Sequence, residues 1–114
     1  MSRRRLRLNH LIREELSELL HRHVNDPRLE AMVTITDVTI TADLRQAKVL
    51  VSVLGTEEEK KAALQGLESA LGFLRHELAG RLDLRYAPEL AFELDDSLER
   101  GDRLVRLMKE VNPS

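Results

Sequence analysis

Apolar residues recur every three or four positions along much of the chain, and this spacing predicts amphipathic helices. The first helix is expected to carry its apolar face from Leu8 to Val24 and to end before Pro27, because proline biases the preceding residue away from helical geometry. A longer helical stretch lies in the middle of the chain. Its leucines all fall on one face: Leu64, Leu67, Leu71, Leu74, Leu78 and Leu82. The pattern therefore predicts a buried helical stripe over 63–82.

A glycine interrupts this central stripe. Gly72 lies where a helix is expected, and a glycine inside a helix costs about 1 kcal/mol relative to alanine. One interpretation is a packing glycine in an ordinary long helix. The other is a kink that divides the stretch into two helices. A kink would bring Ala70 and Gly72 to the surface beside the N–H groups that open the next helix, and a polyanion backbone can approach such a surface.

Alternation of apolar and polar residues predicts three strands. The first begins at Met32, and a change of phase at Asp37 predicts a β-bulge or local twist there. The second spans 47–54, close enough to the first for an antiparallel hairpin. The third is expected to turn three side chains inward: Leu90, Phe92 and Leu94.

Capping residues mark where two further helices begin. Thr56 followed by Glu59 is a capping box, which predicts the start of the central helical stretch. The run 95–97, Asp-Asp-Ser, offers caps for a last helix over about 98–111. The predicted order is helix, strand, strand, helix, kink, helix, strand, helix. This order describes an α+β domain with a three-stranded sheet and helices packed on one face.

Composition bounds the class of protein. The 114 residues fit a single domain over 1–114, and the 42% hydrophobic content can supply one core. Because the chain has no cysteine, neither a disulfide framework nor a thiolate metal site is expected. No apolar run resembles a signal peptide or a membrane span. We expect a cytoplasmic monomer without membrane association, with 1–6 as a flexible basic arm and 112–114 as a short tail.

Charge is distributed unevenly along the chain, although the net charge is only −2. Six arginines against three glutamates give residues 1–25 a charge of +3, which leaves −5 for the remainder. Most of the excess acid lies in 89–102. A basic pole can orient a small protein on a polyanion without an overall basic composition. The alternative is that these charges are solvated faces of a charge-rich domain.

Four short motifs resemble the ribosome-binding factor A family, and the resemblance covers about 6–111. They are the segments 26–29 (Asp-Pro-Arg-Leu), 43–49 (Asp-Leu-Arg-Gln-Ala-Lys-Val), 70–75 (Ala-Leu-Gly-Phe-Leu-Arg) and 84–92 (Leu-Arg-Tyr-Ala-Pro-Glu-Leu-Ala-Phe). The resemblance implies a type II KH-like fold, in which an Ala-x-Gly kink replaces the Gly-x-x-Gly loop of ordinary KH modules. The segment 70–72 matches that kink. The charged C-terminal extension of many relatives has no counterpart in this sequence, so its role is not carried over.

The resemblance also implies a ribosome assembly factor. Such a factor binds the immature small ribosomal subunit and its precursor rRNA and assists late maturation and 5′-end processing without cutting RNA. Charge and the position of the kink predict these RNA-binding residues: Arg3, Arg4, Arg5, Arg7, Arg45, Lys48, Ala70, Gly72, Arg75, His76, Arg81 and Arg85. No cofactor, metal or small-molecule substrate is expected. Because aromatic residues are few and Phe73 is expected to pack near the kink, RNA backbone and shape should dominate recognition.

Two other classes of function stay open. One is a protein-interaction module that docks a partner through its sheet edge or its acidic last helix, without RNA. A steep loss of binding with salt would favour RNA over this alternative. The other class, a hydrolase, is less favoured, because the acidic runs 57–59 and 95–96 fit helix capping and the helix dipole better than catalysis. His21 and His23 lie two apart on a helix and are therefore poor joint metal ligands.

Overall fold

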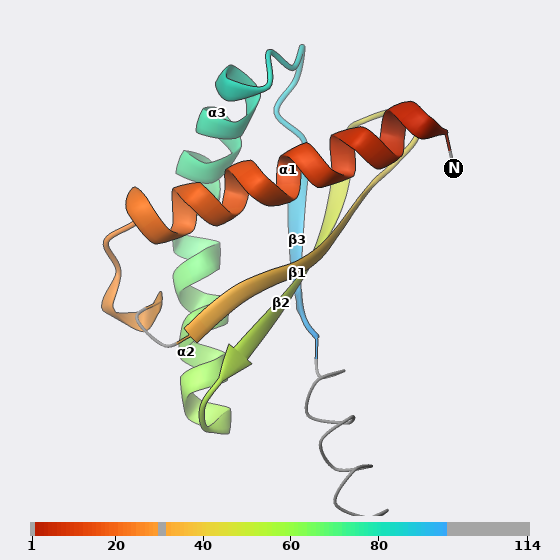
Figure 1. The fold of residues 1–114 in the computed structure, drawn as a ribbon. Coiled ribbons are helices and arrows are strands. Elements are labelled where there is room, and N and C mark those ends of the chain that lie inside the picture. Colours follow the sequence, from red (N-terminus) through yellow and green to blue (C-terminus); the bar gives the residue numbers. More distant parts are fainter. Residues whose placement is uncertain (1, 30–31, 96–114) are drawn as a thin grey trace, which may run out of the picture.

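Helices cover one face of a three-stranded sheet in the computed structural model, which describes residues 2–29 and 32–95 (Figure 1). The elements in chain order are α1 (Arg3–Arg22), the 3₁₀ turn η1 (Pro27–Leu29), β1 (Met32–Ile40), β2 (Gln46–Leu54), α2 (Glu57–Ser69), α3 (Leu71–Arg81) and β3 (Glu89–Leu94). The predicted α+β architecture is confirmed. The last helix and the tail expected after Asp95 lie outside the described residues.

The sheet places β2 in the centre, antiparallel to β1 and parallel to β3. The pairing of β1 with β2 shifts by one residue between Ile35 and Asp37, so Thr36 is the extra residue of a β-bulge. This confirms the irregularity predicted at Asp37. Because of the extra residue, Val38 and Ile40 are buried like the apolar residues that precede the bulge.

The core lies between one face of the sheet and the helices. Helix α1 packs on β1 and α3, and α2 packs on β2 and β3. The largest fully buried aliphatic side chains are Ile12, Leu16, Leu19, Ile40, Val49, Val51, Leu67, Leu74 and Leu78. The expectation for β3 is wrong at its end: Leu90 is buried and Phe92 half-buried, but Leu94 is 39% exposed. As an edge strand, β3 has one neighbour fewer to cover it.

A break at Ala70 divides the central helical stretch. The predicted capping box begins α2: the Thr56 hydroxyl accepts from the Glu59 amide at 3.1 Å, and the Glu59 carboxylate accepts from the Thr56 amide at 3.2 Å. Ala70, with φ −87° and ψ −1°, is both the last cap of α2 and the first cap of α3. The predicted kink is therefore confirmed, and it falls two residues before the glycine. The two helices run one after the other beside the sheet (Figure 1).

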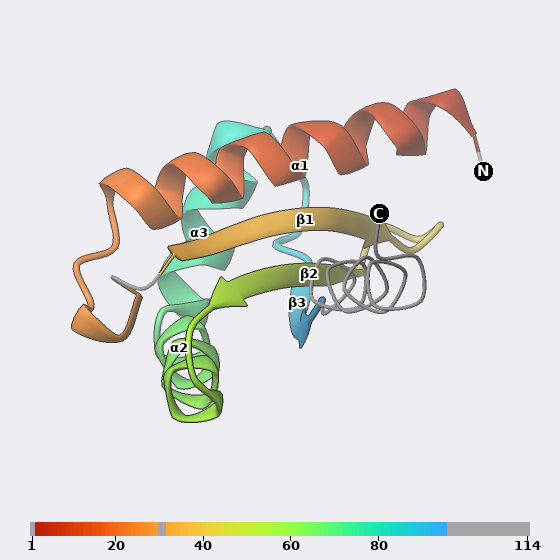
Figure 2. The ribbon, with the colours of Figure 1, turned by 60° about the horizontal axis from the view of Figure 1, so that its bottom comes forward.

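Helix α1 begins earlier than the sequence suggested. The Ser2 hydroxyl accepts a hydrogen bond from the Arg5 amide at 3.2 Å and caps the helix, so Arg3, Arg4 and Arg5 form its first turn. This corrects the expected flexible arm over 1–6. The serine cap provides an acceptor for the first turn, and the apolar face of the helix follows from Leu8 onward. The N-terminal half of α1 lies beside the turn that joins β1 to β2 (Figure 2).

Candidate nucleic-acid interface

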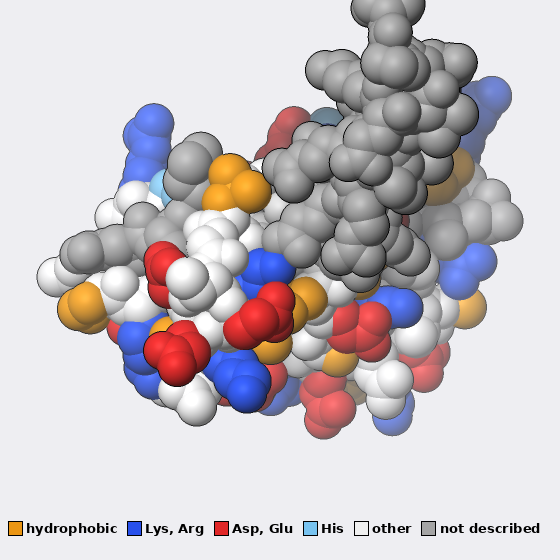
Figure 3. Space-filling model, turned by 90° about the horizontal axis from the view of Figure 1, so that it is seen from below, with side chains coloured by type: hydrophobic (Ala, Val, Ile, Leu, Met, Phe, Trp, Pro, Cys, Tyr) orange, Lys and Arg blue, Asp and Glu red, His pale blue; other side chains and the backbone are white. Residues whose placement is uncertain are grey.

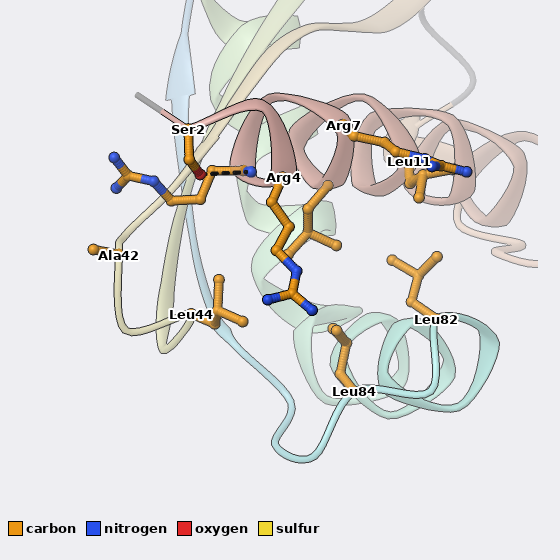
Figure 4. A pocket seen from close by; sticks show the side chains of 10 residues that line it. Ser2, Arg4, Arg7, Leu11, Ala42, Leu44, Leu82 and Leu84 are labelled. Atoms are coloured by element: carbon orange, nitrogen blue, oxygen red, sulfur yellow. Dashed lines mark hydrogen bonds between the residues drawn. The ribbon is translucent and has the colours of Figure 1, made fainter.

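Arginines from three segments gather at one end of the molecule. They come from the first turns of α1, from the β1–β2 turn and from the loop between α3 and β3. We call this surface the arginine end; it comprises Arg3, Arg4, Arg5, Arg7, Arg45 and Arg85. A cavity of about 850 Å³ lies between the same three segments (Figure 4). The fold therefore brings the first turns of α1 to the same cavity as Leu44 and Leu84, which neighbour Arg45 and Arg85 in the sequence.

The arginine end carries six arginines, and Asp43 in the β1–β2 turn is a carboxylate near one of them, Arg45. Among the described residues, none of its six guanidinium groups forms an ion pair with a carboxylate. The first turn of α1 holds no acidic residue, and the amino end of a helix carries a partial positive charge of its own. In contrast, the side of the molecule seen from below shows acidic and basic side chains next to one another (Figure 3). The arginine end is thus the described surface best suited to a polyanion.

The β1–β2 turn is fixed by side-chain hydrogen bonds. The Asp43 carboxylate accepts from the Thr41 hydroxyl at 2.6 Å and from the Arg45 amide at 3.1 Å. The Thr41 hydroxyl in turn accepts from the Gln46 amide at 3.1 Å. Leu44 within this turn has φ +62°, a left-handed conformation that costs a leucine roughly 1 kcal/mol. The turn therefore holds Leu44 and Arg45 in place at the arginine end.

An exposed tyrosine stands beside these arginines. The Tyr86 ring is 60% exposed, and the Arg85 guanidinium lies 5.5 Å from its centre, within range of a cation–π contact. A second hollow, of about 480 Å³, is lined by Tyr86 together with Arg45, Arg75 and the acidic Glu89. Unpaired RNA bases stack on exposed aromatic rings and on guanidinium planes. Tyr86 is absent from the RNA-binding residues predicted from the sequence, because exposure cannot be seen in a motif.

Phe73 is also exposed, contrary to the expectation that it packs near the kink. The ring is 42% exposed, because Leu74 and Leu78 form the buried face of α3 and Phe73 lies off that face. It follows Gly72, which is itself exposed. The kink therefore presents an aromatic surface in addition to small residues.

Arg75 and Arg81, two of the predicted RNA-binding residues, make contacts within the chain. The Arg75 side chain donates to the backbone carbonyls of Pro88 at 3.0 Å and Ala87 at 3.1 Å, just before β3. Arg81 pairs with Glu15 at 3.1 Å and Glu18 at 3.3 Å, which links α3 to α1. The hydrogen bond that Arg81 donates to the Glu15 carboxylate is the main cause of a raised pKa of Arg81. RNA contact by these two arginines stays a prediction, and their internal partners do not favour it.

The kink consists of small residues and is open to solvent. It is flanked by Arg28, which is not among the RNA-binding residues predicted from the sequence. A Cβ placed at Gly72 would meet no atom within 4 Å, and α3 begins without a side-chain cap. Arg28 donates to the Ser69 hydroxyl at 3.1 Å, at the last residue of α2, while its ion pair with Asp26 measures 2.7 Å. The hydrogen bond from Arg28 lowers the pKa of Asp26. The only sequence signal for this contact is the motif 26–29.

The remaining predicted residues lie elsewhere on the surface. His76 is exposed on α3 beyond the kink. Lys48 pairs with Glu93 on the neighbouring strand at 3.2 Å, which leaves its charge partly neutralised. The predicted set therefore separates into the arginine end, the kink with Ala70, Gly72 and His76, and the internally paired side chains of Lys48, Arg75 and Arg81.

Replacing Gly72 by alanine is expected to raise the free energy of unfolding by up to about 1 kcal/mol, because the added methyl meets open space and alanine favours the helix. The bend should persist, since the break lies at Ala70. Binding to RNA or to precursor subunits should weaken, because the methyl occupies the space through which a polyanion backbone would approach. Urea unfolding and a binding titration measure both effects. Unchanged binding would show that Gly72 is not part of the RNA-binding site.

The lowered pKa values of two aspartates predict that the folded protein loses stability in acid. Hydrogen bonds from Arg28 lower the pKa of Asp26, and the Thr41 hydroxyl is the main cause of the lowered pKa of Asp43. A carboxylate with a lower pKa in the folded state stabilises the fold above its unfolded pKa, near 4, and this contribution is lost as the pH falls through the folded pKa. We expect the free energy of unfolding to fall below about pH 4. The Asp26→Asn/Asp43→Asn variant should show a shallower fall; an identical slope would contradict this assignment.

Candidate catalytic and metal-binding groups do not come together in the described ranges. No group of three or more histidine or acidic side chains there could hold a metal ion. The acidic run 57–59 forms the first turn of α2, where Glu59 completes the capping box. No helix of residues 2–29 and 32–95 has the length and apolar character needed to cross a bilayer.

A family model, related sequences and solved structures that match this chain all belong to one family. The sequence model described as "Ribosome-binding factor A" matches residues 4–108. A ribosome-binding factor A of Dictyoglomus thermophilum is 56% identical over 111 residues, covering 97% of this chain and 92% of that protein. The crystal structure of ribosome-binding factor A from Thermus thermophilus matches with a TM-score of 0.70 and 29% identity, covering 79% of this chain and 94% of the other. A homology model of the Thermus thermophilus factor, fitted into the cryo-electron microscopy map of its complex with 30S, matches with a TM-score of 0.65 and 27% identity over 79% of this chain and 93% of the other.

Proposed function

Because the chain belongs to the ribosome-binding factor A family, we propose that it binds the small ribosomal subunit during assembly. In this proposal the protein contacts precursor rRNA and assists late maturation and processing of the rRNA 5′ end, without cutting RNA itself. It acts as a monomer in the cytoplasm. The similarity to a homology model fitted into the map of a complex with 30S supports the choice of the small subunit.

The observation that carries the RNA part of the proposal is the arginine end. Three segments contribute guanidinium groups to it, and none of these groups has a carboxylate partner among the described residues. Guanidinium groups bind phosphate through paired hydrogen bonds, so such a surface can follow an RNA backbone. Tyr86 and Phe73 add exposed rings that can accept unpaired bases. Recognition would therefore combine phosphate contacts with a small number of stacked bases.

A photocrosslinking experiment tests this proposal directly. A photoreactive phenylalanine analogue at position 86 should crosslink to rRNA when the protein is bound to precursor small subunits, because Tyr86 is exposed beside Arg45 and Arg85. The same analogue at Leu54, an exposed residue at the far end of β2, is the matched control and should give few RNA crosslinks. Crosslinks from position 86 to ribosomal proteins alone would contradict direct RNA binding there.

The second candidate function is a protein-interaction module without RNA contact. Its predicted docking sites were a sheet edge and the acidic last helix, and that helix lies outside the described residues. The two functions differ in their response to salt. Phosphate contacts lose affinity steeply as salt rises, whereas an apolar protein interface does not. Binding to precursor subunits that is the same at low and high salt would favour the module.

A further inference from the structure

The cavity at the arginine end has an aliphatic floor. Its apolar lining comes from all three surrounding segments: Leu8 and Leu11 of α1, Leu44 of the β1–β2 turn, and Leu82 and Leu84 of the α3–β3 loop. Three arginines and no acidic residue complete the wall: Arg4, Arg5 and Arg7. In Figure 4 the Arg4 guanidinium reaches down between Leu44 and Leu84, and the Arg7 side chain runs along α1 beside Leu11. The cavity thus combines leucines with cations that have no carboxylate partner among the described residues.

Leu44 is the least expected residue of this lining. Its φ of +62° is a conformation that turns usually assign to glycine or asparagine, and the hydrogen bonds of Asp43 and Thr41 hold it there. The strain is not compensated by burial within the chain, because the side chain stays 40% exposed. Leu44 therefore presents an apolar side chain at the mouth of the cavity in a backbone conformation that the turn holds fixed.

We infer that this cavity binds a short acidic segment of a partner protein, with leucine-like side chains on the aliphatic floor and carboxylates paired to Arg4 and Arg7. The charge of the wall selects an acidic occupant. At about 850 Å³ the cavity is within the size range of small-ligand pockets, so it suits a few side chains rather than a folded domain. This inference goes beyond the proposed RNA binding.

RNA is the less suitable occupant of this cavity. An unpaired base stacks on an aromatic ring, and the lining contains none. Phosphate groups can pair with Arg4, Arg5 and Arg7, but an RNA backbone offers no apolar group to cover the leucine side chains of the cavity. The exposed rings of Tyr86 and Phe73 do not line the cavity. The arginine end and the cavity share Arg4, Arg5 and Arg7, so Leu44→Asn, which removes only an apolar contact of the cavity, is the variant that separates the two functions.

The test is a selection of random displayed peptides on the wild-type protein, followed by measurement of their affinity for variants. Leu44→Asn removes the apolar side chain but tolerates the left-handed conformation, so the variant should unfold at the same temperature or higher. Leu54→Asn is the control, because Leu54 is 54% exposed at the opposite end of β2. Enriched peptides are expected to combine Leu, Ile, Met or Phe with Asp or Glu.

These peptides should bind Leu44→Asn and Arg4→Gln/Arg7→Gln at least about tenfold more weakly than wild type, and Leu54→Asn with unchanged affinity. A lack of enrichment, enriched peptides without acidic residues, or an equal loss in the control would each overturn the inference. Binding of a short single-stranded RNA of random sequence supplies the second measurement. It should be unchanged by Leu44→Asn; a loss as large as that of the peptides would assign the cavity to RNA instead.

Discussion

Replacing Arg3, Arg45 and Arg85 by glutamine is expected to weaken binding to precursor small subunits on the order of 100-fold near physiological salt. Each phosphate contact contributes about 0.7–0.9 to the slope of the logarithm of affinity against the logarithm of salt concentration, so the slope should flatten by about two units. These three arginines are chosen because each comes from a different segment of the arginine end and none of them lines the 850 Å³ cavity. The measurement is a binding titration repeated at several salt concentrations.

A matched control separates this surface from the effect of net charge. Arg13, Arg22 and Lys61 lie outside the arginine end on α1 and α2, and their replacement by glutamine removes the same three positive charges. The salt slope of this variant should stay close to that of the wild type. Equal losses in the two variants would indicate nonspecific attraction. No loss in either would favour the protein-interaction module.

Replacing Arg75 by alanine is expected to lower the free energy of unfolding by about 2–3 kcal/mol and the unfolding temperature by roughly 10 °C or more. The guanidinium group donates to the carbonyls of Ala87 and Pro88, and Pro88 is fully buried. Without Arg75 these acceptors lose their charged donor, and the segment that leads into β3 loses its attachment to α3. The salt slope of RNA binding should stay unchanged, because the side chain is already occupied. Thermal and urea unfolding measure the stability.

Two further variants make this assignment specific. Arg75→Lys keeps the charge but loses the forked donor, so it should recover only a small part of the stability. Arg85→Ala removes an arginine whose described side-chain contact is the Tyr86 ring, and its stability should change by less than about 0.5 kcal/mol. If the Arg75→Ala variant were as stable as the wild type and its salt slope were flatter, Arg75 would be assigned to the RNA-binding surface.

The features predicted correctly from sequence are those whose causes lie close together in the chain. The capping box joins Thr56 to a residue three positions away, and the bulge before Asp37 appears as a change of phase within one strand. The kink was inferred from Gly72, although the helices separate at Ala70. The prediction of a flexible basic arm over 1–6 was wrong at the same local level, because its three arginines suggested a solvated tail, whereas Ser2 caps a helix.

By itself, therefore, the sequence determined the order of the helices and strands within the described residues, most of the buried faces and the family, since hydrogen bonding within helices and the alternation of strands depend on near neighbours. Only the tertiary structure decided which arginines are available to a ligand. Arg81 meets Glu15 across 66 positions, and Arg28 meets Ser69 across 41. All of these charges look alike in the sequence. Those that fold beside carboxylates or backbone carbonyls stabilise the fold, and those that converge without such partners form the arginine end and its cavity.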